Sequence, residues 1–155
     1  MTMEASLKDL SGYYQTIPMA QAMQLEVVGF AGDRLRMRAP LAPNINDKGC
    51  AFGGSLTSLL TIAGWSLATL ELARAGFEAD VFVADSTIRY LAPLYDDLEV
   101  EAWLAEDESW EGFIGMFRQR GKARCQIHAR AGLPQGGDAT TLQGRFVALA
   151  RQAKP

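Results

Sequence analysis

The sequence predicts an α+β domain in which one antiparallel sheet wraps around a long central helix. From Cys50 to Leu70 the chain contains no charged residue, and apolar side chains would lie on most faces of a helix formed there. Such a helix must be covered almost all round. Strand-like segments lie on both sides of it, and those that follow it succeed one another as in a meander, which is typical of an antiparallel sheet.

Length and composition favour one soluble globular domain covering residues 1–155. The chain of 155 residues can bury a sizeable core but is short for two domains. Its 48% apolar and 21% charged residues are ordinary, and its net charge of −3 argues against a dedicated nucleic-acid binder. Two cysteines are too few for a disulfide framework, and the first ten residues do not resemble a secretory signal. We therefore expect free thiols and a cytoplasmic location.

The uncharged run is long enough to span a bilayer. However, it contains three glycines and six Ser/Thr residues, and strand-like sequence lies close on both sides of it. A buried helix explains these features better, so we expect no membrane partner.

The N-terminal part predicts one helix and one hairpin. Leu7–Thr16 is weakly helical, and Pro18 is expected to end that segment. Two strand-like runs then meet at the turn signal Gly32-Asp33. In the second run, apolar residues alternate with arginines and predict one buried and one solvated face: Leu35, Met37, Ala39 and Leu41 against Arg34, Arg36 and Arg38.

A loop leads into the central helix. Pro40–Gly54 is rich in Pro, Asn, Asp and Gly, the residues of turns. The helix is predicted over Ser55–Arg74. Arg74 suits the negative end of its dipole, and Gly76 suits the position just past its end.

The C-terminal half predicts four strands and one short helix. The strands are expected at Val81–Ala92, Leu98–Ala105, Lys122–Ala131 and Thr140–Arg151. Before the third of these strands, apolar residues recur at i, i+3, i+4 and i+7, at Trp110, Phe113, Ile114 and Phe117. This spacing predicts a helix that Asp107 or Ser109 caps and Gly121 ends. The whole order of elements matches the hotdog arrangement, in which a curled sheet and a second subunit cover one helix.

Three segments of the chain resemble a known family. PLAPNINDKGCAFGGSLTSLLTIAGW, VADSTIRYLAPL and GRFVALA are similar to the putative thioesterases typified by the YiiD C-terminal domain. The most specific part is the Asn-x-Asn-Asp-x-Gly loop that runs into Gly53-Gly54, with Arg89-Tyr90-x-x-Pro93 on the next strand. The resemblance implies a hotdog subunit that works as a homodimer or a dimer of dimers, with sites at the subunit interface. It does not specify the substrate.

Thioester hydrolysis needs donors for the carbonyl oxygen and a base or nucleophile. Gly53 and Gly54 would present free backbone N–H groups at the positive end of the helix dipole. The alternative is a plain tight turn before a helix that Ser55 caps. Asp47, in the loop just before the helix, is the first candidate for the acid that activates water or attacks directly. Its alternative role is that of an Asx-turn residue.

Further candidates lie in the loop and on the next strand. Strict alternation along Val81–Ala92 divides its side chains between two faces of the strand. One face carries Phe82, Ala84, Ser86, Ile88 and Tyr90. The other face carries Val81, Val83, Asp85, Thr87 and Arg89. Asp85 or Ser86 would reach a neighbouring subunit's site, with Asp85 as the second candidate acid; alternatively, Asp85 and Arg89 tie strands or subunits through ion pairs. The candidate catalytic residues are Asp47, Asn46, Gly54, Asp85 and Ser86, and the candidate substrate-binding residues are Asn44, Phe52, Gly53, Ser55 and Tyr90.

Other reactive residues carry weaker expectations. His128, the only histidine, falls on the polar face of its strand, and one histidine with two scattered cysteines predicts no metal site and no cofactor. Cys50 ranks below Asp47 as a nucleophile. A basic cluster, Arg118, Arg120, Lys122 and Arg124, is suited to the phosphates of coenzyme A or of a carrier protein's phosphopantetheine, or is simply a solvated turn. Two functions stay open: a thioesterase acting on acyl-CoA or acyl carrier protein, and a non-catalytic acyl-thioester binding or sensing protein.

Overall fold

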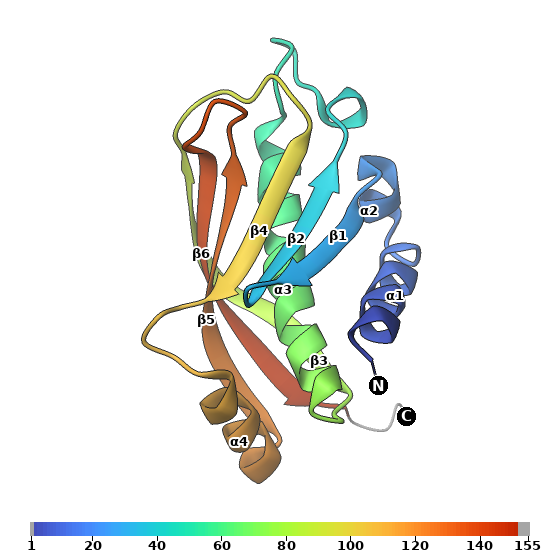
Figure 1. Cartoon of the computed structure of the whole chain (residues 1–155), viewed down its shortest axis with the longest axis vertical. Coiled ribbons are helices and arrows are strands. Elements are labelled where there is room, and N and C mark those ends of the chain that lie inside the picture. The colour runs from blue at the N-terminus through green and yellow to red at the C-terminus, as the bar shows by residue number, and fades with distance from the viewer. Residues whose placement is uncertain (1, 152–155) are drawn as a thin grey trace.

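A computed structural model describes residues 2–151, which form one six-stranded antiparallel sheet around a single long helix (Figure 1). The strand order is β1-β2-β4-β5-β6-β3. The helical elements are α1 (Met3–Tyr14), α2 (Pro18–Met23), the 3₁₀ turn η1 (Ala42–Asn44), α3 (Gly53–Arg74) and α4 (Trp110–Arg120). The strands are β1 (Glu26–Ala31), β2 (Arg34–Ala39), β3 (Ala79–Tyr90), β4 (Leu98–Leu104), β5 (Lys122–Gly132) and β6 (Asp138–Ala150). The predicted hotdog architecture is confirmed.

The central helix α3 lies in direct contact with the sheet. A Cβ atom placed on Gly64 would come within 2.5 Å of the Phe146 ring on β6, so glycine permits this close approach. By length and composition α3 is the one helix among residues 2–151 that is able to cross a membrane, yet 56% of its most apolar window is buried inside the fold. Its apolar character is therefore explained by its place in the core.

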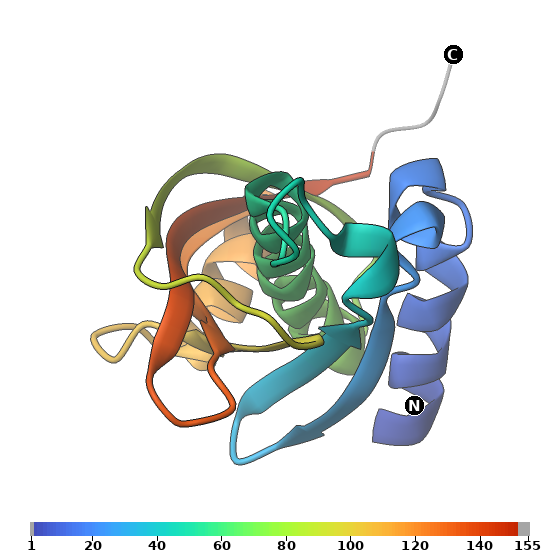
Figure 2. The same cartoon turned by 90° about the horizontal axis from the view of Figure 1, so that it is seen from above.

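The N-terminal segment forms two helices instead of the single helix predicted there. The first ends at Tyr14, and Pro18 opens a second helix, α2, because a proline in the first turn loses no hydrogen bond. The Tyr14 hydroxyl is hydrogen-bonded to Ser66 of α3, and this buried contact fixes α1 beside the core. Seen from above, α1 lies alongside β1 and covers that edge of the sheet (Figure 2).

The hairpin of β1 and β2 is confirmed. Gly32 and Asp33 both have positive φ angles, 58° and 59°, as a type I′ turn requires. The predicted faces of β2 are correct up to its end at Ala39, since its apolar side chains are buried and its arginines pair with Glu101 on β4 and Glu26 on β1. Leu41, which was also predicted to be buried, lies beyond the strand and is half-buried.

The meander expectation is correct for β4, β5 and β6 but wrong for β3. Strand β3 does not pair with β4; it pairs with β6, at the far edge of the sheet. A sheet that wraps a helix needs strands on both sides of it, and the connection after β3 crosses the end of α3 to reach β4 (Figure 2). This crossing is fixed by a hydrogen bond of 2.8 Å from the Ala51 N–H to the Leu94 carbonyl.

Strict alternation along β3 is wrong because a bulge between Val83 and Asp85 shifts the register against β6. Val81 and Val83 pair with buried residues of β6, and so do Ser86 and Ile88 after the bulge. The α3-facing side of β3 therefore changes from odd to even residue numbers, and Phe82 lies on the opposite side.

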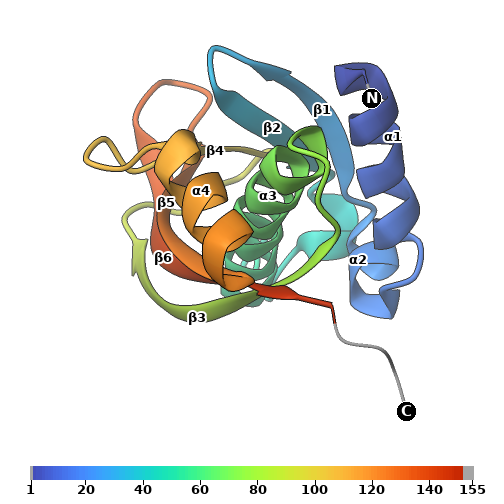
Figure 3. The same cartoon turned by 90° about the horizontal axis from the view of Figure 1, so that it is seen from below.

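Helix α4 matches its prediction and lies below β5, beside the C-terminal end of α3 (Figure 3). Of the two proposed caps, Ser109 is correct: its Oγ accepts a hydrogen bond of 3.0 Å from the Gly112 N–H. Gly121, with φ of 69°, ends the helix.

Candidate functional site

The N-terminal end of α3 carries backbone N–H groups without hydrogen-bond acceptors. We call this end, residues 52–55, the mouth of the helix. The helix begins at Gly53, two residues before the predicted start, so Ser55 is not its cap. Phe52 occupies the capping position without a side-chain hydrogen bond, and the first helical bond runs from Leu56 N–H to the Phe52 carbonyl, at 3.0 Å. Among residues 2–151, no acceptor contacts the N–H groups of Gly53, Gly54 and Ser55. These amides, at the positive end of a 22-residue helix, favour an anionic oxygen.

Two aromatic rings flank this mouth. A Cβ atom on Gly54 would lie 2.5 Å from the Phe52 ring, and one on Gly53 would lie 3.3 Å from the Tyr90 ring. Both rings remain accessible, with 55% of Phe52 and 58% of Tyr90 exposed. The sequence prediction that Gly53, Gly54, Phe52 and Tyr90 lie together therefore agrees with the geometry.

One member of the mouth was missed from sequence. The Tyr90 hydroxyl lies 2.5 Å from Thr57 Oγ1 and also donates to the Gly53 carbonyl at 3.3 Å. Thr57 stands four residues after Gly53, on the same face of the helix, and this spacing is the signal that points to it. The hydroxyl pair anchors β3 to the first turn of α3.

Asn44 and Asn46 hold the loop before α3. Asn44 is buried, and its Nδ2 donates to the carbonyls of Met23 and Pro40 at 2.9 and 2.8 Å. Asn46 Oδ1 accepts from the N–H groups of Lys48 and Cys50 at 2.8 and 3.1 Å. Asn46, a candidate catalytic residue, and Asn44, a candidate substrate-binding residue, thus both hold the backbone of this loop.

Asp47 lies at the exposed tip of this loop. The loop is a short hairpin, closed by the Ile45–Ala51 bridge, and its tip extends beyond the end of α3 (Figure 1). The Asp47 side chain is 80% exposed and forms an ion pair of 3.1 Å with its neighbour Lys48. Asn46 makes the Asx-type contacts expected of Asp47. No contact joins Asp47 to Gly53 or Gly54 among the described residues.

Asp85 and Ser86 are separated by the pleat of β3. Asp85 forms an ion pair with Arg145, its cross-strand partner on β6, which is the interstrand tie given as its alternative role. Ser86 lies on the same side of the strand as Tyr90, facing α3. The two candidate acids are thus both exposed, and neither touches the mouth of α3 within one chain.

The remaining reactive residues lie in structural positions. His128 stacks on Trp103 with ring centroids 5.9 Å apart. Cys50 is buried and accepts a contact of 3.2 Å from Asn46 Nδ2. Burial, aided by the charge of Glu108, raises the pKa of Cys125 to about 12. Within residues 2–151, no three His, Cys, Asp or Glu side chains group as metal ligands do.

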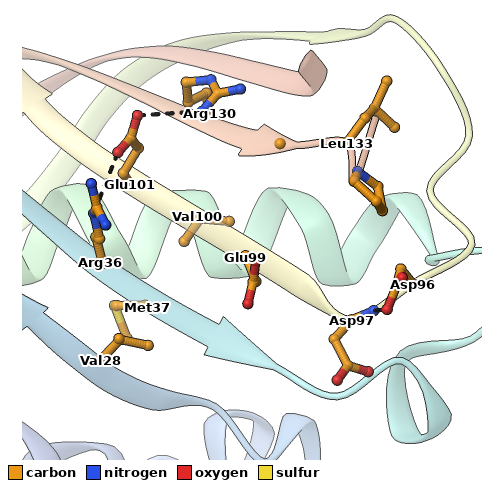
Figure 4. Close-up of a pocket in the computed structure, with 12 residues that line it drawn as sticks. Val28, Arg36, Met37, Asp96, Asp97, Glu99, Val100, Glu101, Arg130 and Leu133 are labelled. Atoms are coloured by element: carbon orange, nitrogen blue, oxygen red, sulfur yellow. Dashed lines mark hydrogen bonds and ion pairs between the residues drawn. The ribbon is translucent and has the colours of Figure 1, made fainter. Parts of the chain in front are cut away.

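Three sizeable cavities lie away from this mouth. One of about 630 Å³ lies over β2 and β4, where Glu101 pairs with Arg36 at 3.7 Å and with Arg130 at 3.3 Å (Figure 4). Another, of about 970 Å³, lies between α1 and the C-terminal half of α3, and a third, of about 610 Å³, lies beside α4. Neither Gly53 nor Tyr90 lines any of the three. Because the Phe52 and Tyr90 rings are both more than half exposed, the mouth of α3 is open to solvent in a single chain.

Comparisons with known proteins agree with this architecture. A putative thioesterase from Shewanella oneidensis is 30% identical, with 95% of this chain and 99% of that chain covered and a TM-score of 0.84. A protein of unknown function from Chlorobaculum tepidum is 28% identical over 97% and 98% of the two chains, with a TM-score of 0.90. A thioesterase from Haemophilus influenzae shares only 14% identity over 97% and 92% of the chains, with a TM-score of 0.68, a likeness of fold alone.

The family model for the YiiD C-terminal domain, described as a putative thioesterase, matches residues 7–150. This match covers nearly the whole described chain and includes the Asn/Asp loop, the glycine pair and the C-terminal strand. The chain therefore belongs to the YiiD C-terminal family of putative thioesterases.

Proposed function

We propose that this protein hydrolyses an acyl thioester at the mouth of α3. The observation that carries the proposal is the set of unbonded amides of Gly53 and Gly54, which lie beside the Tyr90–Thr57 hydroxyl pair in a member of a putative thioesterase family. Preorganised amide donors of this kind lower an acyl-transfer barrier by roughly 3–4 kcal/mol each.

The reaction requires water, a base and a stabilised oxyanion. A carboxylate removes a proton from water as the water oxygen bonds to the thioester carbon, and the carbonyl oxygen becomes an oxyanion held by the two glycine amides. The carbon–sulfur bond then breaks, and the carboxyl group returns its proton to the leaving thiolate. The products are one carboxylic acid and one thiol.

We assign the base to Asp47. It lies on the hairpin that leads directly into the mouth, and Lys48 is the one side chain of the described residues that pairs with its carboxylate. Asp85 is the second candidate, but its carboxylate is held by Arg145 on the side of β3 that faces away from α3. An exposed carboxylate at the end of a short hairpin reaches a substrate that lies on an open mouth more readily than a cross-strand ion pair does.

A second copy of the chain completes the site in this proposal. Among residues 2–151, strand β3 pairs only with β6, so its other edge is free there. Exposed apolar side chains gather along this edge and just beyond it: Phe82, Val83, Tyr90 and Leu91. A free apolar edge favours pairing with another strand. A homodimer formed there, in the cytoplasmic setting that two free cysteines favour, would cover the open mouth.

The test is release of free thiol from a panel of acyl-CoA and acyl-carrier-protein substrates. We expect turnover by the wild-type protein, a loss of at least 100-fold in kcat for Asp47→Asn, and no change for Asp9→Asn, an exposed acid on α1 at the β1 edge of the sheet. If Asp85→Asn abolishes turnover while Asp47→Asn does not, the base is Asp85.

The absence of a carboxylate contact at the mouth, among the described residues, favours a second candidate function: binding of acyl thioesters without hydrolysis. Tight binding of acyl-CoA, with no thiol release from any substrate of the panel, would establish this function in place of the first.

A further inference from the structure

A groove beside α4 concentrates positive charge. It has a volume of about 610 Å³ and is lined by the exposed side chains of Arg120, Lys122 and Arg124. Within residues 2–151, none of the three forms a salt bridge. The one acidic residue of the groove, Glu108, accepts a hydrogen bond of 2.8 Å from the Gln126 N–H. Three cations therefore stand against one anion in a chain whose net charge is −3.

The floor of the same groove is apolar. Phe113, Met116 and Val147 lie between the basic side chains. Arg118, the fourth member of the basic cluster predicted from sequence, is not part of the groove, because its guanidinium lies 5.4 Å from the centre of the Phe77 ring. Guanidinium and ammonium groups bind phosphate oxygens, whereas an apolar floor suits a flat aromatic base. Free phosphate would need only the cations, so the combination favours a nucleotide.

We propose that this groove binds the 3′-phospho-ADP part of coenzyme A. The inference rests on the proposed thioesterase function and identifies the thiol carrier as coenzyme A rather than a carrier protein.

The groove is too far from the mouth of α3 in its own chain. Val147 pairs with Phe82, at one end of β3, whereas the mouth contacts Tyr90, at the other end. Eight residues of strand at about 3.3 Å each separate the two by roughly 26 Å. A pantetheine arm, which joins the thioester to the pyrophosphate, does not bridge that gap.

A second copy removes this difficulty. Two β3 edges related by a two-fold axis pair in an antiparallel manner, so the Tyr90 end of one lies beside the Phe82 end of the other. Measured along the sheet, two to three strand spacings of about 4.8 Å then separate the groove of one chain from the mouth of the other, roughly 10–15 Å. A pantetheine arm spans this distance. The groove therefore serves the partner's mouth.

Calorimetry with coenzyme A and with pantetheine tests the groove without any need for turnover. We expect the wild-type protein to bind coenzyme A at least tenfold more tightly than pantetheine, and the double variant Lys122→Ala/Arg124→Ala to lose this preference. Arg118→Ala, outside the groove, is the matched control and should keep it. A double variant that retains wild-type preference for coenzyme A would overturn the assignment.

Complementation between subunits tests which mouth the groove serves. A mouth variant, Gly54→Leu, and the groove double variant are co-expressed with different tags, and the mixed dimer is isolated and assayed with acyl-CoA. If the groove acts in trans, one of its two sites carries both defects and the other none, so up to half of the wild-type rate returns. Each parent should stay at least tenfold below wild type. No recovery in the mixed dimer refutes action in trans, and turnover of acyl carrier protein alone refutes coenzyme A as the carrier.

Discussion

Gly64 tests how closely α3 approaches the sheet. The helical position predicts that Gly64→Ala stabilises the protein by about 1 kcal/mol, because glycine is a poor helix former. The new Cβ, however, would lie 2.5 Å and 2.7 Å from two atoms of the Phe146 ring, against about 3.5–4.0 Å for an ordinary carbon contact. Phe146 is 0% exposed, so the ring has no free space to enter. Overpacking of this kind costs about 1–3 kcal/mol, and against the gain of about 1 kcal/mol from helix propensity we expect a net loss of up to about 2 kcal/mol.

Urea unfolding followed by circular dichroism measures this effect against a matched control. Gly115 lies in the interior of α4, and a Cβ there would meet nothing within 4 Å. Gly115→Ala should therefore raise the free energy of unfolding by about 0.5–1 kcal/mol, the opposite sign from Gly64→Ala. If both substitutions stabilise the protein equally, the helix does not touch β6 in the way described.

Three further substitutions probe stability and one probes the mouth. Burial raises the pKa of Cys125 from 9.0 to about 12, so near pH 10 the thiol loses its proton in the unfolded state alone. The free energy of unfolding should therefore fall by about 1.4 kcal/mol between about pH 8 and pH 10. Thermal melts should show that Cys125→Ala removes this decrease. Asn44→Ala leaves two backbone carbonyls without their donor and should cost about 2 kcal/mol in urea unfolding. Ser109→Ala removes the cap of α4 and should cost about 1 kcal/mol in the same assay. Tyr90→Phe breaks the hydroxyl pair with Thr57 and should lower kcat roughly tenfold while the melting temperature changes little.

The parts of the fold that sequence predicted are those set by local patterns. Alternation placed the buried face of β2 correctly, and Gly121 and one of the two proposed caps, Ser109, mark the ends of α4. The pairing of β3 with β6 did not follow, because contacts between segments far apart in the chain leave no local signal. The bulge at Val83–Asp85 was missed for the same reason, since it is defined only against the partner strand.

In the candidate site, too, local patterns were predictable from sequence and contacts between distant segments were not. Gly53 and Gly54 were predicted at a helix start because glycine pairs and uncharged helices are visible in sequence, and Tyr90 followed from the family motif. The orientations of the Asp47 and Asp85 side chains were not predictable. That of Asp47 depends on the geometry of a hairpin tip, and that of Asp85 depends on the cross-strand partner Arg145.

The position of β3 has a consequence for biosynthesis. Among residues 2–151 its strand partner is β6, the last of the six strands in chain order, and α3 also needs β4, β5 and β6 to cover it. A nascent chain that has emerged only as far as β3 therefore exposes a mostly apolar helix and an unpaired strand at the same time. Such intermediates are prone to aggregate. Folding of this domain must wait until β6 has been made, and a chain that stops before β6 would be a substrate for chaperones rather than a folded fragment.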